Sequence, residues 1–396
     1  MRVEHPDDAW LVGGIRSGFG RFGGALRDVS MVDLGSRIVR AVLEGYAWPE
    51  TAIDEFDVGV GMIEAGLMVP ARQIAAAAGL PAHLPSITVD RACCSGAAVV
   101  GLATRALATG ARAVVCLGVE TMSRTPRLLH GTRGTDRLGD LEVEDLLLMR
   151  SPLTGTSIAE YVGRVALEHN VDREAQDEWA LGSHQRYFAA RDAGFFNDEI
   201  VPVETPTGTH LEDEPPRRDT SLERLAALPT VRNSPTITAG NAPGLNDGAC
   251  AVIVADGATT RERGETPTRI HSYLQTADSP TSSAYLPGVA IARLCTEADI
   301  AVGDLDVIEI NEAYAATPLV SVRRMAGGDP GLEKELLART NANGGAVAIG
   351  HPIGASGARL VLTAARRLAR EGGRWAAIAI CGGFGQADAV LLEAAG

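Results

Sequence analysis

Two parts of the chain carry the same order of sequence markers, and this repetition constrains the fold more than any other feature. An aspartate-containing turn leads into an apolar strand at 53–58, and a similar turn does so at 302–307. Helix starts rich in small residues follow at Ser95 and Ser356, and each predicted helix runs on into an apolar strand that ends in glycine. Because three pairs of markers keep their order, we predict a duplicated unit of alternating strands and helices.

Each unit is expected to form a sheet covered by helices, which makes the chain an α/β protein. We place the first half at 1–120, completed by about 244–265, and the second half at 266–396. The segment 121–243 has a different texture, with an arginine-dotted loop, a Pro-Pro pair and an apolar periodicity that predicts one helix over 158–190. We interpret it as an inserted loop or lid region that contacts the substrate.

Charge and composition exclude several classes of partner. The 396 residues carry a formal net charge of −14, which argues against a nucleic-acid groove and against an anionic membrane surface. Lys334 is the single lysine, so an anionic ligand must be bound by arginine, helix N-termini or backbone. No apolar run is long enough to span a bilayer, and we expect no secretory signal in the first ten residues.

The cysteines indicate a reducing compartment, and we expect a cytoplasmic protein. Six cysteines occur, and their spacing does not form a disulfide framework. The eight histidines are scattered singly without ligand spacing, so no metal site is expected. Four of the cysteines are interpreted as buried structural residues: Cys94, Cys116, Cys250 and Cys295.

Cys93 is the candidate nucleophile. It lies between an apolar strand at 86–89 and an alanine-rich helix predicted over 97–109, where the helix start favours thiolate over thiol. A lone cysteine is more often a small hydrophobic core residue. Here a His-Pro-x-Gly-x-Ser-Gly run at 351–357 and a Cys-Gly-Gly-Phe-Gly run at 381–385 supply a base and a second thiol. This combination predicts nucleophilic catalysis.

Four segments in this order resemble the thiolase family of acetyl-CoA acyltransferases: Cys93–Gly96, Asn311–Ala315, Gly350–Gly357 and Cys381–Gly385. The resemblance covers essentially the whole chain. Further segments similar to those of the family are Arg16–Gly24, Gly118–Ser123, Thr238–Asn241 and Asn246–Ala249.

The resemblance implies a duplicated fold with a five-layered α-β-α-β-α core and acyl transfer through an S-acyl cysteine. It implies that Cys93 is acylated, that His351 is its base and that Cys381 is the acid or base at the α-carbon. His351 and a water held by Asn311 would form one oxyanion site, and the backbone N–H groups of Cys93 and Gly383 would form the other. The expected reaction is thiolytic cleavage of a 3-oxoacyl-CoA or the reverse Claisen condensation.

The same resemblance makes acyl-CoA and coenzyme A substrates, with no bound cofactor, and implies a homodimer or homotetramer. The chain departs from the family pattern at Asp90, where asparagine is usual, and at Pro243, where a serine contacts the pantetheine arm. Two methionines that line a small acyl pocket are replaced at Gly155 and Ser283, which predicts a preference for longer or branched acyl groups. Residues expected to contact coenzyme A or the acyl group are Arg218, Ala239, Gly240, Pro243, Tyr285 and Leu286.

Two other functions stay open at this point. A decarboxylating condensing enzyme of the 3-oxoacyl synthase type shares the duplicated fold, but it places two histidines, or histidine and asparagine, beside its cysteine. The second thiol, Cys381, argues against it. The altered pocket segments would also suit an acyl-CoA-binding protein of weak activity, whereas the intact reactive residues favour an enzyme.

Overall fold

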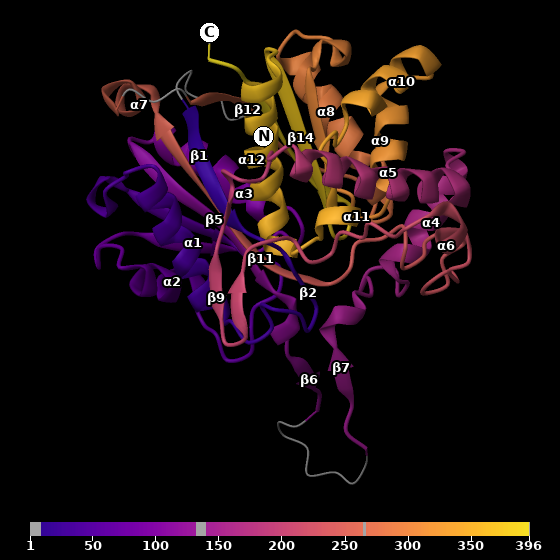
Figure 1. The fold of residues 1–396 in the computed structure, drawn as a ribbon, viewed down its shortest axis with the longest axis horizontal. Coiled ribbons are helices and arrows are strands. Elements are labelled where there is room, and N and C mark those ends of the chain that lie inside the picture. Colours follow the sequence, from indigo (N-terminus) through magenta and orange to yellow (C-terminus); the bar gives the residue numbers. More distant parts are fainter. Residues whose placement is uncertain (1–8, 132–139, 264–266, 396) are drawn as a thin grey trace.

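The computed structural model describes residues 9–131, 140–263 and 267–395, and a single large sheet runs through it (Figure 1). Two short strands join this sheet at its side: β2 (Gly20–Arg21) pairs with β11, and β8 (Ile200–Val201) pairs with β1. From one edge to the other, the main path is β13 (Val307–Ile310), β14 (Trp375–Gly382), β15 (Gln386–Glu393), β12 (Thr268–Ala277), β1 (Ala9–Ser17), β11 (Asn246–Asp256), β5 (Ala113–Thr121), β3 (Glu55–Gly59) and β4 (Ser86–Val89).

The sheet consists of two halves with the same topology. In the first half β3 is parallel to β5, and β5, β11 and β1 follow in antiparallel order. In the second half β13 is parallel to β14, and β14, β15 and β12 follow in antiparallel order. The two half-sheets are joined where Trp10 and Leu11 of β1 pair with Arg269 and Thr268 of β12. The duplication predicted from the sequence is therefore present in the strand order.

Helices cover both faces of the half-sheets and also lie between them (Figure 1). No helix among the described residues is long and apolar enough to cross a membrane. The helices of the two halves are α1 (Met31–Gly45), α2 (Pro70–Ala78), α3 (Ser95–Ala108), α7 (Gly257–Arg263), α8 (Leu286–Glu297), α9 (Ala316–Met325), α10 (Pro330–Arg339), α11 (Ala346–Ile349) and α12 (Ile353–Glu371), with 3₁₀ turns η1 (Glu50–Ala52), η4 (Ser282–Ala284) and η5 (Val302–Asp304).

The alternation of side chains along each strand sorts them into layers. On β5, Val115 and Leu117 pack with α1 and α2, while Val114 and Cys116 pack with α3 and α12. β14 divides its side chains in the same way between the α3–α12 layer and the layer of α8 and α9. The result is the predicted five-layered α-β-α-β-α core, with α3 and α12 in the central layer.

The segment between β5 and β11 holds the inserted elements. The sequence predicted one helix over 158–190, but the structure has two helices in this range. Asn170 adopts a left-handed φ of 54°, and the Asp172 side chain caps the second helix by accepting from the Ala175 backbone N–H, so the first helix ends before them. The inserted elements are η2 (Met122–Arg124), β6 (Arg127–Leu129), β7 (Val143–Asp145), η3 (Leu146–Leu148), α4 (Ile158–Glu168), α5 (Arg173–Asp192), β9 (Val203–Thr205), β10 (Gly208–His210) and α6 (Leu222–Ala226), together with β8.

The N-terminal ends of α3 and α12 touch each other through glycines. A Cβ atom at Gly96 would lie 2.6 Å from the carbonyl oxygen of Gly354, and one at Gly357 would lie 2.2 Å from the backbone nitrogen of Ala97. Such contacts with backbone atoms cannot be relieved by a side-chain rotation. The glycines therefore allow the two helices of the central layer to approach closely at the ends that carry the reactive residues.

Gly357→Ala is expected to lower the free energy of unfolding by about 1–3 kcal/mol, because the new methyl group overlaps the backbone of α3. Gly303→Ala is the matched control, since the nearest atom to its added Cβ lies 3.7 Å away. Thermal unfolding followed by circular dichroism measures the effect. Equal melting temperatures for the two variants would show that the helix contact is not tight.

Candidate active site

Cys93 and His351 are brought together by the two central helices. Cys93 lies in the turn between β4 and α3, and His351 lies in the turn between α11 and α12. The His351 Nε2 atom is 3.1 Å from the Cys93 Sγ atom. This is hydrogen-bonding distance for a thiol and an imidazole, so the predicted pairing of nucleophile and base is present in the geometry.

The turn that carries Cys93 is held by its neighbours. Ala92 adopts a left-handed φ of 50°, and its N–H donates to the Asp90 Oδ1 atom at 2.9 Å. Arg91, between Asp90 and Ala92, forms an ion pair of 2.8 Å with the buried Asp388 of β15. An asparagine side chain at position 90 would accept the same hydrogen bond through its amide oxygen. The departure at Asp90 therefore preserves the turn and adds a charge.

Hydrogen bonds fix the orientation and the tautomer of His351. Ser356 donates its single hydroxyl hydrogen to the Pro352 carbonyl oxygen at 2.9 Å, and its Oγ atom lies 2.6 Å from His351 Nδ1. His351 Nδ1 must therefore carry the proton and donate it to Ser356, which leaves Nε2 as an acceptor facing Cys93. The His351 backbone N–H also donates to Asn246 Oδ1 at 2.8 Å.

The pair rests in its neutral form. Burial raises the pKa of Cys93 well above its ordinary value, and the nearby Cys381 and Glu120 raise it further. Burial, with a contribution from Arg359, lowers the pKa of His351 to about 4. The helix start was expected to favour thiolate at Cys93, but that effect is commonly worth about 0.3–1 kcal/mol and is outweighed by burial. Thiolate therefore forms only when the Cys93 proton moves to His351.

The second thiol, Cys381, lies near the end of β14 and lines the same cavity as Cys93 and His351. Burial raises its pKa to about 12, so it is a proton donor at neutral pH. Gly383 also lines this cavity. Asn311 lies beside His351, with Nδ2 3.4 Å from Nε2, and its buried Oδ1 atom has no partner among the described residues. That free acceptor suits the water expected at Asn311.

The cavity has a volume of about 940 Å³ and is lined mainly by apolar side chains. Of the expected coenzyme A contacts, Pro243 lines it. Arg218, Ala239 and Gly240 lie outside the lining, and the exposed Arg218 forms an ion pair with Asp192 at 2.8 Å. A contact between these three residues and coenzyme A stays a prediction.

Neither Tyr285 nor Leu286, the residues expected at the acyl group, lies at the cavity, whereas their neighbour Ser283 does. Leu286 is buried in the hydrophobic core around α8, and Tyr285 directs its hydroxyl group to Asp278 at 3.1 Å. Both side chains pack against the hydrophobic core around α8.

Glu120 is a site residue that sequence reasoning missed, although its segment was recognised. Its buried carboxylate accepts hydrogen bonds from the backbone N–H groups of Gly61, Met62 and Gly354 at 2.9, 3.1 and 2.9 Å. Burial raises its pKa to about 8, against the opposing effect of these bonds. Glu120 thereby ties a cavity-lining loop to the start of α12.

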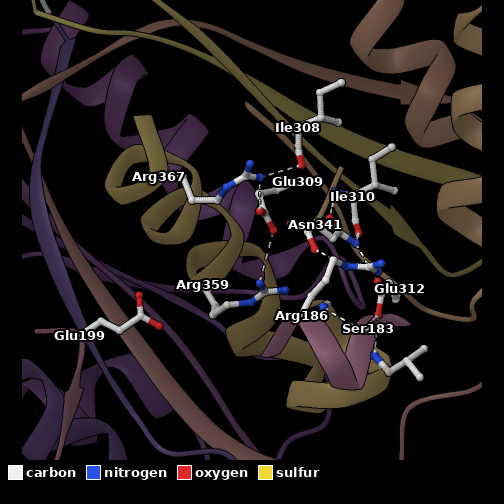
Figure 2. Close-up of polar contacts among 12 residues, drawn as sticks. Ser183, Arg186, Glu199, Ile308, Glu309, Ile310, Glu312, Asn341, Arg359 and Arg367 are labelled. Atoms are coloured by element: carbon white, nitrogen blue, oxygen red, sulfur yellow. Dashed lines mark hydrogen bonds and ion pairs between the residues drawn. The ribbon is translucent and has the colours of Figure 1, made fainter. Parts of the chain in front are cut away.

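A buried polar network surrounds Glu312 (Figure 2). The Glu312 carboxylate accepts from Trp179 at 2.8 Å, from Ser183 at 2.9 Å and from Asn341 at 3.0 Å, and it also accepts from the Val347 backbone N–H at 2.9 Å. These donors belong to α5, to the loop after α10 and to α11. The network therefore joins the inserted helix to the segment that leads into His351.

Two arginines of α12 contact one buried carboxylate of β13 (Figure 2). Glu309 of β13 is fully buried and pairs with Arg367 at 2.9 Å, and the wholly buried Arg359 lies 3.7 Å from its second oxygen. Buried charges of this kind need such partners, so the three side chains fix the register of α12 against β13.

Comparison with known proteins decides the family. Residues 9–258 match the family model of the thiolase N-terminal domain, and residues 265–394 match that of the thiolase C-terminal domain. The chain belongs to the thiolase family. This confirms the resemblance and the acyltransferase class inferred from the sequence motifs, and thiolase activity is the function that the family supports.

Relatives and solved structures match along nearly the whole chain. A probable acetyl-CoA acetyltransferase of Mycolicibacterium smegmatis is 39% identical over 397 residues, which is 97% of this chain and 100% of the relative. A beta-ketoadipyl-CoA thiolase of Pseudomonas putida is 38% identical over 407 residues, or 98% and 99% of the two chains. The crystal structure of human mitochondrial 3-ketoacyl-CoA thiolase superposes with a TM-score of 0.93 at 33% identity, covering 98% and 99%. The thiolase fold is thereby confirmed.

Alkylation of Cys93 by iodoacetamide is expected to accelerate about tenfold per pH unit from pH 6 to pH 9, because only the small thiolate fraction reacts. Mass spectrometry of the labelled peptide measures the rate at Cys93 itself, and Cys93→Ala provides the blank. A rate that is already constant between pH 6 and pH 8 would instead indicate a preformed thiolate–imidazolium pair.

Cys381→Ser is expected to reduce cleavage of a 3-oxoacyl-CoA by about 100-fold or more, because only carbon–carbon bond cleavage needs a proton delivered to the α-carbon. Exchange of labelled coenzyme A into acetyl-CoA should persist within a few-fold, because no carbanion forms in that reaction and His351 can pass the Cys93 proton to the departing coenzyme A thiolate. The control Cys295→Ser, a buried thiol outside the cavity, should retain both reactions, and Cys93→Ala should lose both. Equal losses of the two rates in Cys381→Ser would contradict a specific role for this thiol.

Proposed function

We propose that the chain cleaves 3-oxoacyl-CoA thioesters with free coenzyme A and that Cys93 carries the acyl group between the two thiols. The observation that supports this most directly is the 3.1 Å contact between His351 Nε2 and Cys93 Sγ, beside a second thiol in the same cavity. His351 takes the Cys93 proton, and the thiolate attacks the C3 carbonyl. The C2–C3 bond then breaks, and Cys381 protonates the carbanion of the departing acetyl-CoA.

The second half-reaction restores all three groups. The Cys381 thiolate takes the proton of free coenzyme A, and the resulting thiolate attacks the acyl group on Cys93. When the tetrahedral intermediate collapses, Cys93 leaves as thiolate and recovers its proton from His351. In both half-reactions the oxyanion of the tetrahedral intermediate on Cys93 would accept from the backbone N–H groups of Cys93 and Gly383. When the C2–C3 bond breaks, the enolate oxygen of acetyl-CoA would accept from His351 and the Asn311 water. The same steps in reverse give the Claisen condensation.

Coenzyme A is proposed as substrate rather than bound cofactor. A solved structure with a TM-score of 0.92 is human mitochondrial 3-ketoacyl-CoA thiolase in complex with CoA, at 33% identity. Pro243 at the cavity is the expected neighbour of the pantetheine arm, and its ring offers no hydroxyl group for a hydrogen bond. Arg218 on the outer surface remains the proposed partner of a coenzyme phosphate, with Ala239 and Gly240 beside the arm.

We propose that acyl groups longer than acetoacetyl are preferred. Ser283 occupies a position where the family usually has a methionine, so the cavity gains space next to the reacting centre. The alternatives receive less support, because an acyl-CoA-binding protein does not require a neutral Cys93–His351 pair and a decarboxylating enzyme does not require Cys381.

The proposed setting is fatty acid metabolism in the cytoplasm, where the six cysteines stay free thiols, as they are in the structure.

We also propose a homodimer, or a dimer of such dimers. β4 is an edge strand, and Ile87 on it is 50% exposed, next to Met68 at 76% and Val69 at 67%. An exposed apolar edge of this kind is suited to pairing with a second copy, and light scattering gives the mass in solution.

Steady-state cleavage of a chain-length series of 3-oxoacyl-CoA thioesters tests the proposal. We expect a higher kcat/KM for 3-oxooctanoyl-CoA than for acetoacetyl-CoA, with an acyl group on Cys93 seen by mass spectrometry. Ser283→Met should lower the ratio of long to short substrate about tenfold or more, because it refills the pocket. Ser283→Ala, which keeps the space, should leave that ratio nearly unchanged. Cleavage without acylation of Cys93 would refute the mechanism, and a preference for acetoacetyl-CoA would refute the pocket assignment.

A further inference from the structure

Besides the half-buried Tyr314, three residues with buried hydroxyl groups line the reaction cavity outside the catalytic set. They belong to Tyr161 on α4, Ser283 in η4 and Thr317 on α9, and all three line the cavity that contains Cys93 and Cys381. Their side chains are almost fully buried, with 4%, 4% and 0% of the residue surface exposed. A pocket that binds only alkyl chains does not need polar groups in its buried wall.

The three hydroxyl groups come from elements that pack against one another. The Tyr161 hydroxyl oxygen lies 3.5 Å from Ser283 Oγ, which links α4 to η4. Ser321 of α9 donates to the Ala284 carbonyl oxygen at 3.0 Å, which links α9 to η4. Tyr161 is also close enough to Cys381 and Cys93 for both thiols to influence its pKa. The cluster therefore shares one cavity with Cys93 and Cys381.

These hydroxyl groups have unused hydrogen-bonding capacity. Thr317 Oγ1 has no partner within the described ranges, and the 3.5 Å contact between Tyr161 and Ser283 is at the outer limit for a hydrogen bond. Burial raises the pKa of Tyr161 to about 12, so its hydroxyl group keeps its proton at neutral pH and can donate it. An alkyl chain that filled this space would displace water and leave these groups unpaired, which is unfavourable.

The charges around the cavity indicate that the matching group on the substrate is neutral. Among the described lining residues Arg150 is the only arginine, and it is exposed. Four acidic residues line the same cavity, namely Asp90, Glu142, Glu144 and Asp145, of which Glu144 contacts His130 at 2.7 Å and Asp145 contacts Arg127 at 3.5 Å. A carboxylate at the end of the acyl chain would therefore meet more negative than positive charge. A hydroxyl, ether or carbonyl oxygen would not incur this repulsion.

We propose that the preferred substrate is a 3-oxoacyl-CoA whose acyl chain carries a neutral oxygen function, recognised by the hydroxyl groups of Tyr161 and Thr317. Ser283 accepts from Tyr161 or bonds the same oxygen, and the apolar side chains of Ile158 and Val162 pack against the carbon atoms of the chain. This inference rests on the proposed thiolytic function and specifies its substrate class.

Ether isosteres of 3-oxooctanoyl-CoA test the proposal, with one oxygen in place of carbon 5, 6 or 7. Each pair has the same length and nearly the same shape, and an ether is less hydrophobic than the alkyl chain. A purely apolar pocket would therefore prefer the alkyl substrate. We expect at least one ether to have a kcat/KM about tenfold higher than 3-oxooctanoyl-CoA. 3-Oxoadipyl-CoA, which carries a carboxylate, should show no such gain.

Two variants remove a hydroxyl group with little change of shape, and a third is the control. Thr317→Val and Tyr161→Phe should each lower the ether-to-alkyl ratio towards one, because the ether rate falls more than the alkyl rate. Thr363→Val removes a buried, unpartnered hydroxyl group on α12 that does not line the cavity, and it should keep the wild-type ratio.

Each other outcome is decisive. Wild-type ratios of one or less for all three ethers, a ratio that survives both hydroxyl-removing variants, or a preference for 3-oxoadipyl-CoA would overturn the inference while thiolysis of 3-oxooctanoyl-CoA still supports the proposed function. If the wild-type protein cleaves none of these substrates and also fails to cleave acetoacetyl-CoA, the proposed function fails and the inference fails with it.

Discussion

The close contact between the N-terminal ends of α3 and α12 is the constraint on which the site depends. Each helix begins two residues after a reactive side chain, so the distance between Cys93 and His351 is set by how near the helix starts can come. At Gly96 and Gly357 there is no Cβ atom to overlap the backbone of the other helix. The two half-sheets then enclose this helix pair from both sides, which buries the reactive groups and shifts both of their pKa values towards the neutral forms.

A second support comes from buried carboxylates that bridge separate parts of the chain. Glu312 connects the inserted helix α5 with α11, and Glu120 connects a cavity loop with α12. Each carboxyl group accepts three or more hydrogen bonds, so its buried oxygen atoms have partners. Since both lie within a few residues of cavity-lining segments, the shape of the substrate pocket and the position of His351 are mechanically linked.

The sequence carried the architecture and the reactive residues, because both are encoded in local patterns. The repeated order of strand and helix-start patterns predicted the duplication. The motifs around Cys93, His351 and Cys381 predicted that two thiols and a base lie in one site. The break between α4 and α5 was missed, since apolar periodicity continues across it. The sequence could not show that Thr317 lines the cavity, or that Ser283 does so and Tyr285 does not. Which face of η4 meets the cavity depends on how η4 packs against α4 and α9, and this packing is not encoded in the local sequence of η4.

The duplication also has a consequence for how such an enzyme can evolve. One copy contributes the nucleophile, and the other contributes both proton carriers, so the ancestral symmetry survives in the scaffold but not in the chemistry. Neither copy retains a spare set that could compensate for a damaging mutation in its twin. The two repeats have become complementary specialists, and their inheritance as a single gene product guarantees the equal supply of both that the reaction demands.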